Sequence, residues 1–155
     1  FPYTTLFRSG HDPAASYNLI QSMLAISSGG LTGSMRDTPI HVPVKESDFI
    51  FTAVSEHMGF IGTTALLILI FFFLARCMYV ASKIQPSSPA LSYTMVGLTA
   101  ALAIHYIENL GMTVGLLPIT GIPLPFVSLG GSAMIVNFFA LGIMLSISLE
   151  RNINQ

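Results

Sequence analysis

"MGFIGTTALLILIFFFLA", residues Met58 to Ala75, is the stretch that decides the fold. It holds 18 residues and no charged side chain. Backbone polar groups find no partners in lipid, so an apolar run of this length crosses a bilayer as a helix. We predict a spanning helix here. With its more polar start it would run from about residue 48 to residue 82.

The composition of the whole chain agrees with a membrane protein. The 155 residues are 52% hydrophobic and only 8% charged, with a mean hydropathy of +0.72. Soluble domains carry about 25% charged residues, which excludes an ordinary soluble globule. The net charge of -1 and the lack of a basic patch exclude nucleic acid as a partner. The single cysteine, Cys77, lies in an apolar run and is expected to be buried and inert.

Two further spans are predicted, at residues 91–116 and 132–149. The uncharged stretch from Asn109 to Leu149 has 41 residues, too many for one helix, and "LLPITGIPLPFVSLGGS" interrupts it with proline and glycine. Non-helical backbone at membrane depth must be buried in protein or line a cavity. We therefore expect a re-entrant-like loop that forms the wall of a site.

A short helix is expected before the first span, within Ser16–Met35. Its apolar residues recur at helical spacing, and Gly29-Gly30 ends the pattern. The residues of this face are Leu19, Ile20, Met23, Leu24 and Ile26. The segment is too short to span, so it should lie in a loop or at the membrane surface. The predicted fold class is an all-α polytopic integral membrane protein with about three spans.

Basic residues give a prediction of orientation. Arg76, Lys83 and Arg151 fall on one side of the predicted spans, and Arg36 and Lys45 on the other. Cytoplasmic loops carry the excess of Lys and Arg. The 36–48 loop and the Pro/Gly loop are therefore expected on the outer face.

The N-terminus reads as foreign sequence. "FPYTTLFRS", residues 1–9, matches the in-frame translation of a common sequencing adapter, and we expect the chain to be a C-terminal fragment. The remaining organisation is then an outer-face loop region at 10–47, a membrane domain at 48–151 and a tail at 152–155. A fragment of this kind is expected to be inactive alone.

Asp48 stands at the entry to the first span and has two interpretations. It can complement the helix dipole at position N1, with Ser47 as the capping residue. It can also be a general base held at the membrane surface. Asp48, Thr52 and Glu56 follow one another at i, i+4 and i+8, so they share a stripe. Such a stripe should face protein or a water-filled cleft, although an interfacial boundary also fits.

The second predicted span carries His105, Glu108 and Asn109. An ionisable group inside a span is a candidate functional residue, but Glu108 can equally be a structural hydrogen-bond partner. His105 alone favours a helix contact, because no other histidine stands at ligand spacing for zinc. Ser128 and Ser132 flank Gly130-Gly131 without an evident base, which favours capping and close packing over nucleophilic chemistry.

Three motifs carry a family resemblance: "YNLIQSMLAISSGGLTG", "SDFIFTAVSEHMGFIG" and "ENLGMTVGLLPITGIPLPFVSLGGS". Together they resemble the C-terminal part of the SEDS family (shape, elongation, division and sporulation; RodA, FtsW and SpoVE type) over residues 12–151. "VPVKESD" and "ENLGM" favour the rod-shape RodA branch of Gram-positive bacteria. The resemblance implies a multi-pass protein of the bacterial cytoplasmic membrane. It would polymerise lipid II into peptidoglycan at the outer face, with a class B penicillin-binding protein transpeptidase as partner.

The resemblance also assigns roles to residues. It places the family's essential acid on Asp48, as general base, and the first Glu of a common pair on Glu56. Two positions depart from the family: Val44 replaces an acid, and His57 replaces the second Glu of the pair. Leu129 stands where an aromatic residue is frequent.

The substrate cleft would be shaped by Glu56 and by the loop from Pro118 to Ser132. The substrate-binding residues implied in this way are Glu56, Lys45, Ser128, Gly130, Gly131 and Ser132. An inverting displacement needs one carboxylate, and the departing diphosphate needs a cation. Lys45 is the nearest basic side chain. The alternative is a divalent ion, Mg or Mn, bound mainly by residues upstream of this sequence.

Two other functions suit the same features. A transporter of the lipid-linked precursor would also need polar groups inside its spans and a broken loop. A non-catalytic scaffold for the penicillin-binding protein would need only the apolar faces.

Overall fold

The computed structural model describes residues 13–33 and 48–153, and these residues form helices and no strand. The helices are α1 (Pro13–Ser28), α2 (Ile50–Ile84), α3 (Pro89–Thr113) and α4 (Gly131–Ile153). Three segments are long and apolar enough to cross a membrane: Ile50–Ile84, Pro89–Thr113 and Gly131–Leu149. The all-α class, the three spans and the short additional helix are confirmed.

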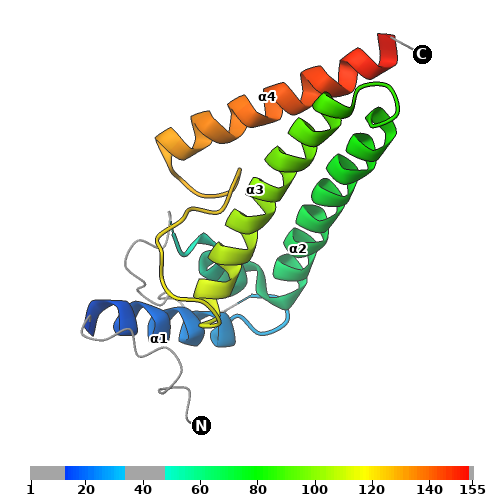
Figure 1. The fold of residues 1–155 in the computed structure, drawn as a ribbon. Helices are drawn as coiled ribbons and strands as arrows, with labels where there is room; N and C mark the ends of the chain where they lie inside the picture. Colours follow the sequence, from blue (N-terminus) through cyan, green and yellow to red (C-terminus); the bar gives the residue numbers. More distant parts are fainter. Residues whose placement is uncertain (1–12, 34–47, 154–155) are drawn as a thin grey trace.

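Helices α2 and α3 form an antiparallel hairpin (Figure 1). At its turn, the Ser92 hydroxyl donates a hydrogen bond of 2.8 Å to the carbonyl oxygen of Ala81. Pro89 starts α3, where a missing N–H costs nothing. Cys77 of α2 is buried, as predicted, in the hydrophobic core that α2 and α3 form with α4 and the loop before it. The buried residues of this core are Ile70, Cys77, Val80, Ala81, Ile84, Met95, Leu102, Tyr106, Leu124, Met144 and Ile147.

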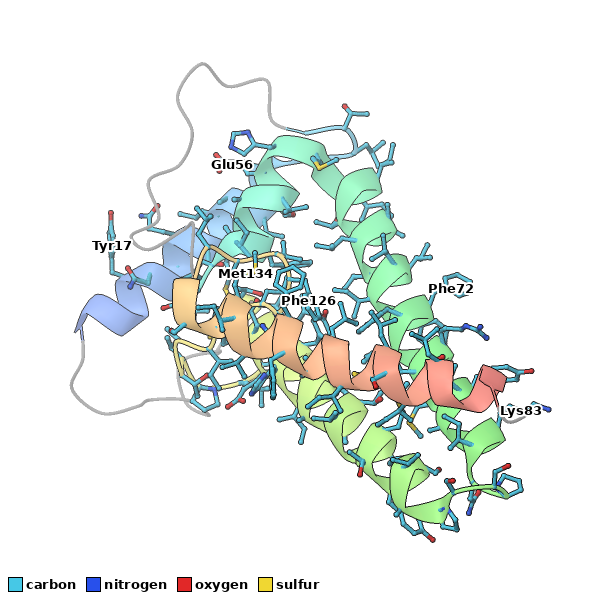
Figure 2. The ribbon with its side chains drawn as sticks, turned by 90° about the horizontal axis from the view of Figure 1, so that it is seen from above. Tyr17, Glu56, Phe72, Lys83, Phe126 and Met134 are labelled. Atoms are coloured by element: carbon cyan, nitrogen blue, oxygen red, sulfur yellow. The ribbon has the colours of Figure 1, made fainter. Side chains whose placement is uncertain are left out.

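Helix α4 crosses the hairpin obliquely. Its C-terminal end lies near the α2–α3 turn, and its N-terminal end diverges from α3 (Figure 1). Met144 and Ile147 attach it to the core. Its opposite face exposes apolar side chains such as Phe139, and α2 likewise exposes Phe72, which points away from the other helices (Figure 2). Apolar surfaces of this extent are typical of contact with lipid or with other membrane helices.

The first predicted span is not one continuous helix, which corrects the expectation for residues 48–82. Gly59 breaks α2 with φ 63° and ψ -160°, a backbone region that essentially only glycine adopts. Past the break, the N–H groups of Phe60 and Ile61 donate to the carbonyl oxygens of Gly30 and Leu31, at 2.9 and 3.1 Å. The loop after α1 therefore supplies the acceptors that a continuous helix would have supplied. The remaining α2 residues, 60–84, form the long helical arm of the hairpin.

Helix α1 lies across the end of the hairpin that is remote from the α2–α3 turn (Figure 1). Ser22 and Ala25 face the protein and are fully buried. Ile20 and Leu24 of the predicted apolar face point outward, with 56% and 49% of their surface exposed. Small residues thus make the fully buried contact, whereas Ile20 and Leu24 are free for a membrane surface and Leu19 and Met23 lie against Gly115.

The segment between α3 and α4 is non-helical and firmly held. The Tyr106 hydroxyl donates to the carbonyl oxygen of Pro125 at 3.3 Å. Phe126 packs edge-to-face on Phe73 of α2 and Phe138 of α4, with ring centroids 5.9 and 5.6 Å apart. Figure 2 shows Phe126 among the helices. The backbone of Phe126 has φ 64°, which is rare for a bulky residue. The predicted wall is therefore anchored in the protein, as expected.

Candidate functional site

The site begins with the short part of α2 before the break. Thr52, Ser55 and Glu56 are buried there, with 0%, 5% and 1% of their surfaces exposed. Thr52 and Glu56 of the predicted polar stripe face protein, as one interpretation required, but they lie on the half-helix before the break and not on the long arm of the hairpin. Gly29 explains the close packing, since a Cβ at Gly29 would collide with the carbonyl oxygen of Ser55.

Hydrogen bonds of the Ser22 hydroxyl join this half-helix to α1 and α3. The Ser22 Oγ of α1 donates to the carbonyl oxygen of Thr113 in α3 at 3.0 Å. It lies 2.6 Å from Thr52 Oγ1 of α2. Because the one Ser22 proton goes to Thr113, the Thr52 hydroxyl donates to Ser22 Oγ. All three residues have 0% exposure, so α1 is an internal support of the site.

Asp48 precedes α2 and is half-buried. The N-cap residue is Phe49, whose carbonyl oxygen accepts from the N–H of Thr52 at 3.0 Å. The expectation of Asp48 at N1 is therefore wrong, because the helix begins two residues later than the capping pattern predicted. The Asp48 carboxylate lies against Gly121, where an added Cβ would stand 3.3 Å from Oδ2.

Asn109 connects Asp48 with the loop. Its Nδ2 donates to the carbonyl oxygens of Asp48 and Ile122, each at 2.8 Å. Asn109 is fully buried. The structure thus brings Asn109 of the predicted intramembrane group next to the candidate base. Glu108, the residue before it, is half-buried on α3.

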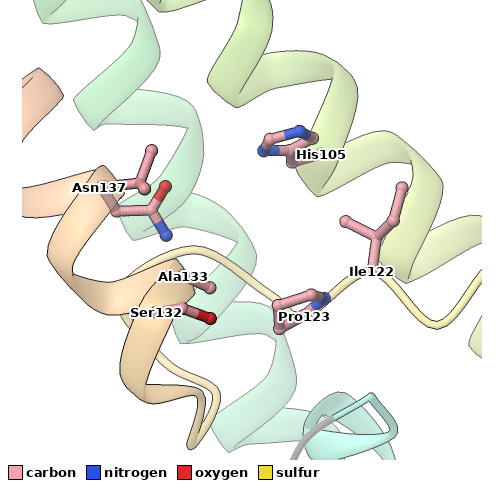
Figure 3. A pocket seen from close by; sticks show the side chains of 7 residues that line it. His105, Ile122, Pro123, Ser132, Ala133 and Asn137 are labelled. Atoms are coloured by element: carbon pink, nitrogen blue, oxygen red, sulfur yellow. The ribbon is translucent and has the colours of Figure 1, made fainter.

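A pocket of about 340 Å³ opens between α3, α4 and the loop (Figure 3). Ile122 and Pro123 form the loop side, directly after the glycine that touches Asp48. His105 faces it from α3, and Ser132 and Asn137 from α4 (Figure 3). Its full lining is His105, Ile122, Pro123, Ser132, Ala133, Val136 and Asn137. Polar side chains from two helices therefore meet in a mainly apolar pocket, which suits a ligand with hydrogen-bonding groups. One wall of this pocket continues the loop whose Gly121 contacts Asp48.

The serine and glycine residues of the loop end have different settings. Ser128 is buried, and its Oγ accepts from the N–H of Leu124 at 2.8 Å, which closes a turn. The Gly130 carbonyl oxygen accepts the first hydrogen bond of α4, from the N–H of Met134. No described atom lies within 4 Å of a Cβ added at Gly131. The buried turn thus accounts for Ser128. Of the predicted residues Ser128, Gly130, Gly131 and Ser132, only Ser132 lines the pocket.

Some sequence predictions concern residues that the structure does not describe. They are the predictions for Lys45, Val44 and the 1–9 segment. Among the residues that the structure describes, no group of three or more His, Cys, Asp or Glu side chains could hold a metal ion. The described residues do not by themselves fit a divalent cation.

Sequence reasoning missed two polar groups of the site. Asn137 lies inside a span, where an amide is unfavourable in lipid, and that signal alone could have singled it out. Ser22 gave no such signal, because a serine in a short helix is ordinary. Only the meeting of α1 with Thr52 and Thr113 reveals its role.

Comparison with known proteins identifies the family. Residues 4–153 match the family of FtsW, RodA and SpoVE, described as cell cycle proteins. The chain belongs to this family. It is 37% identical over 152 residues to stage V sporulation protein E of Bacillus subtilis, covering 94% of this chain and 40% of that protein. It is 38% identical over 146 residues to the peptidoglycan glycosyltransferase MrdB of Escherichia coli, covering 90% of this chain and 39% of MrdB.

A solved structure has the same fold. This chain matches one chain of a peptidoglycan synthase complex, described as coordinating polymerization and crosslinking, with a TM-score of 0.70 and 28% identity. The match covers 87% of this chain and 37% of that one. The chain spans about 40% of the length of the curated relatives described above. A probable peptidoglycan glycosyltransferase FtsW of Bacillus subtilis is 34% identical, so these identities do not single out the rod-shape branch, which stays a prediction.

Proposed function

We propose that this chain is part of a peptidoglycan glycosyltransferase that polymerises lipid II, with Asp48 as the general base. The observation that carries the proposal is the position of Asp48. Its carboxylate lies against Gly121, and the next two residues of that loop form one wall of the pocket. The names of the relatives MrdB and FtsW support the reaction class.

The reaction would be a single inverting displacement. A sugar hydroxyl attacks the anomeric carbon of a lipid-linked donor, the new C–O bond forms, and the bond to the diphosphate oxygen breaks. Asp48 accepts the hydroxyl proton. The diphosphate leaves as an anion without protonation, so a second carboxylate is not required, unlike in most glycosidases.

The pocket would hold an uncharged part of the substrate. Its polar groups are the His105 imidazole, the Ser132 hydroxyl and the Asn137 amide, which suit sugar hydroxyls and amides. Glu56 is buried in the half-helix and would act on the shape of the cleft. Gly130 and Gly131 would let substrate approach the backbone at the start of α4.

Charge compensation for the diphosphate is the remaining requirement. Lys45 and a divalent ion, Mg or Mn, are the two proposed sources. The described residues do not form a set of ligands for such an ion, so residues outside them would have to bind it. A class B penicillin-binding protein would supply crosslinking. The description of the related complex, which pairs polymerization with crosslinking, supports such a partner.

The decisive experiment uses a full-length protein that carries this sequence. Asp48→Asn keeps the side-chain size and removes the base, so we expect no glycan polymer from purified lipid II. Expression and binding of the penicillin-binding protein should stay normal. Polymer at the wild-type rate would falsify the catalytic assignment.

The same assay separates the alternatives. Movement of lipid II across vesicle membranes without polymer would indicate a transporter. The scaffold role is tested with the Asp48→Asn protein and glycan made by another polymerase. Normal stimulation of the partner's crosslinking in that assay would favour a scaffold role that is independent of polymerisation.

A further inference from the structure

Asn109 uses both of its amide hydrogens on backbone carbonyl groups from two distant segments. One belongs to Asp48, at the entry to α2, and the other to Ile122, in the loop before α4, each at 2.8 Å. The amide is planar, so its two N–H directions diverge at a fixed angle. The position of one carbonyl group therefore determines that of the other.

The two segments that Asn109 joins also contact each other directly. Gly121, the residue before Ile122, has φ 69° and lies against Oδ2 of Asp48. A single amide thus holds the backbone of the candidate base and the surface on which its carboxylate rests. A shift of either segment would move the carboxylate relative to the pocket wall at Ile122 and Pro123.

The oxygen of the same side chain makes no comparable contact in the part of the chain that the structure describes. Asn109 Oδ1 is buried and finds no hydrogen-bond partner among the described residues. A buried acceptor without a partner is unfavourable, so the two hydrogen bonds that Nδ2 donates must offset the cost of burying this oxygen. The two donors are the feature that distinguishes asparagine here.

We propose that Asn109 is a positioning residue that sets the Asp48 carboxylate against Gly121, the residue before the Ile122–Pro123 wall of the pocket. The inference rests on the proposed function, in which Asp48 is the base. Asn109 does not touch the reacting atoms, so it acts on the rate of the chemical step through geometry. Misplacement of a reacting group by about 1 Å can cost about 100-fold in rate.

The kinetic test compares variants in the full-length protein. Asn109→Leu keeps the volume and removes both donors, and Asn109→Ser keeps a single donor. We expect kcat for polymerisation to fall roughly 10- to 100-fold in Asn109→Leu, with KM for lipid II within about two-fold of the wild type. Asn109→Ser should lie between them. A fall in kcat at constant KM distinguishes misplacement of the base from loss of substrate binding.

The matched control is Thr99→Val, on the same helix. Thr99 is also buried, at 2% exposure, but its hydroxyl donates to Met95 of its own helix and lies beside Cys77 of α2, so it joins neither Asp48 nor the loop. We expect its kcat per folded molecule and its KM for lipid II to equal those of the wild type. An unchanged kcat in Asn109→Leu, or an equal loss in Thr99→Val, overturns the inference.

A structural measurement separates this inference from the proposed reaction. Amide hydrogen exchange should speed up in residues 48–52 and 119–124 of Asn109→Leu and stay normal there in Thr99→Val. If Asp48→Asn polymerises lipid II normally, the proposed function fails, and the exchange experiment still decides whether Asn109 couples the two segments. Wild-type protection of both segments in Asn109→Leu overturns the coupling whatever the reaction is.

Discussion

The backbone N–H of Phe60 donates to the carbonyl oxygen of Gly30, 2.9 Å away, across the break in α2. This bond closes the helix with a residue from a different segment. The bond can form because Gly59 turns the chain and because the backbone of Gly33, from the loop after α1, packs directly against Gly59. The half-helix that carries Thr52 and Glu56 owes its position to this contact.

Gly59→Ala should therefore destabilise the protein strongly. The backbone conformation of Gly59 alone costs a side chain about 1–3 kcal/mol, and the added Cβ would also meet the carbonyl carbon of Leu31 at 2.7 Å. The midpoint of thermal unfolding in detergent measures the loss. Gly97→Ala is the control, because nothing lies within 4 Å of its added Cβ, and it should be neutral or stabilising by about 0.5–1 kcal/mol. Equal midpoints for the two variants would contradict this account.

Ser22→Ala should loosen α1 from the helices beneath it. The change leaves the Thr113 carbonyl oxygen and the Thr52 hydroxyl without their buried partner, at a cost of about 1–3 kcal/mol. Ser82→Ala removes an exposed hydroxyl that bonds only to Tyr79 of its own helix, so it should change stability by less than about 0.5 kcal/mol. Proteolysis within residues 13–33 measures the loosening. Equal cleavage of Ser22→Ala and the wild type would be evidence against the hydroxyl network.

Phe126 should couple energetically to Phe73. The two rings meet edge-to-face at 5.9 Å, and such pairs contribute about 0.5–1.5 kcal/mol beyond their buried area. A double-mutant cycle with alanine at both positions, followed by thermal unfolding, measures this term. The exposed pair Phe71 and Phe72, at 6.1 Å, is the control and should show a smaller coupling. Strict additivity at Phe126 and Phe73 would mean that the loop is not anchored there.

Filling the pocket should weaken substrate binding if the pocket holds a non-reacting part of lipid II. Ala133→Phe places a ring in the space of about 340 Å³. We expect KM to rise roughly 10-fold with little change in kcat, because binding is lost equally in the ground state and the transition state. Ala101→Phe, on an exposed position of α3, is the control. An unchanged KM in Ala133→Phe would remove the pocket from the substrate path.

Labelling of introduced cysteines should reveal the orientation. The loop that contains Thr120 and the α2–α3 turn that contains Ser87 lie at opposite ends of the hairpin (Figure 1). The positive-inside rule predicts that a membrane-impermeant maleimide reaches Thr120→Cys in intact cells and Ser87→Cys only after permeabilisation. Both side chains are exposed, and the natural Cys77 is buried and can be replaced by alanine. The reverse pattern would place the loop in the cytoplasm.

The sequence by itself determined the class of the fold and the existence of its main parts. Long uncharged runs have one stable form in a bilayer, because a helix pairs its own backbone groups. Proline and glycine between α3 and α4 excluded a continuous helix, so a buried loop could be predicted. The motifs around Asp48 also indicated the family that the comparisons identify.

Only the tertiary structure decided how these parts form a site. The break at Gly59 depends on carbonyl groups of Gly30 and Leu31, which lie about 30 residues earlier in the chain. The position of Asp48 depends on Asn109 and Gly121, from two other segments. Periodicity reports which side of a helix is apolar, but hydrogen bonds between distant segments form only when the packing brings them together. For that reason the sequence could name the candidate base, and only the folded chain could show what holds it in place.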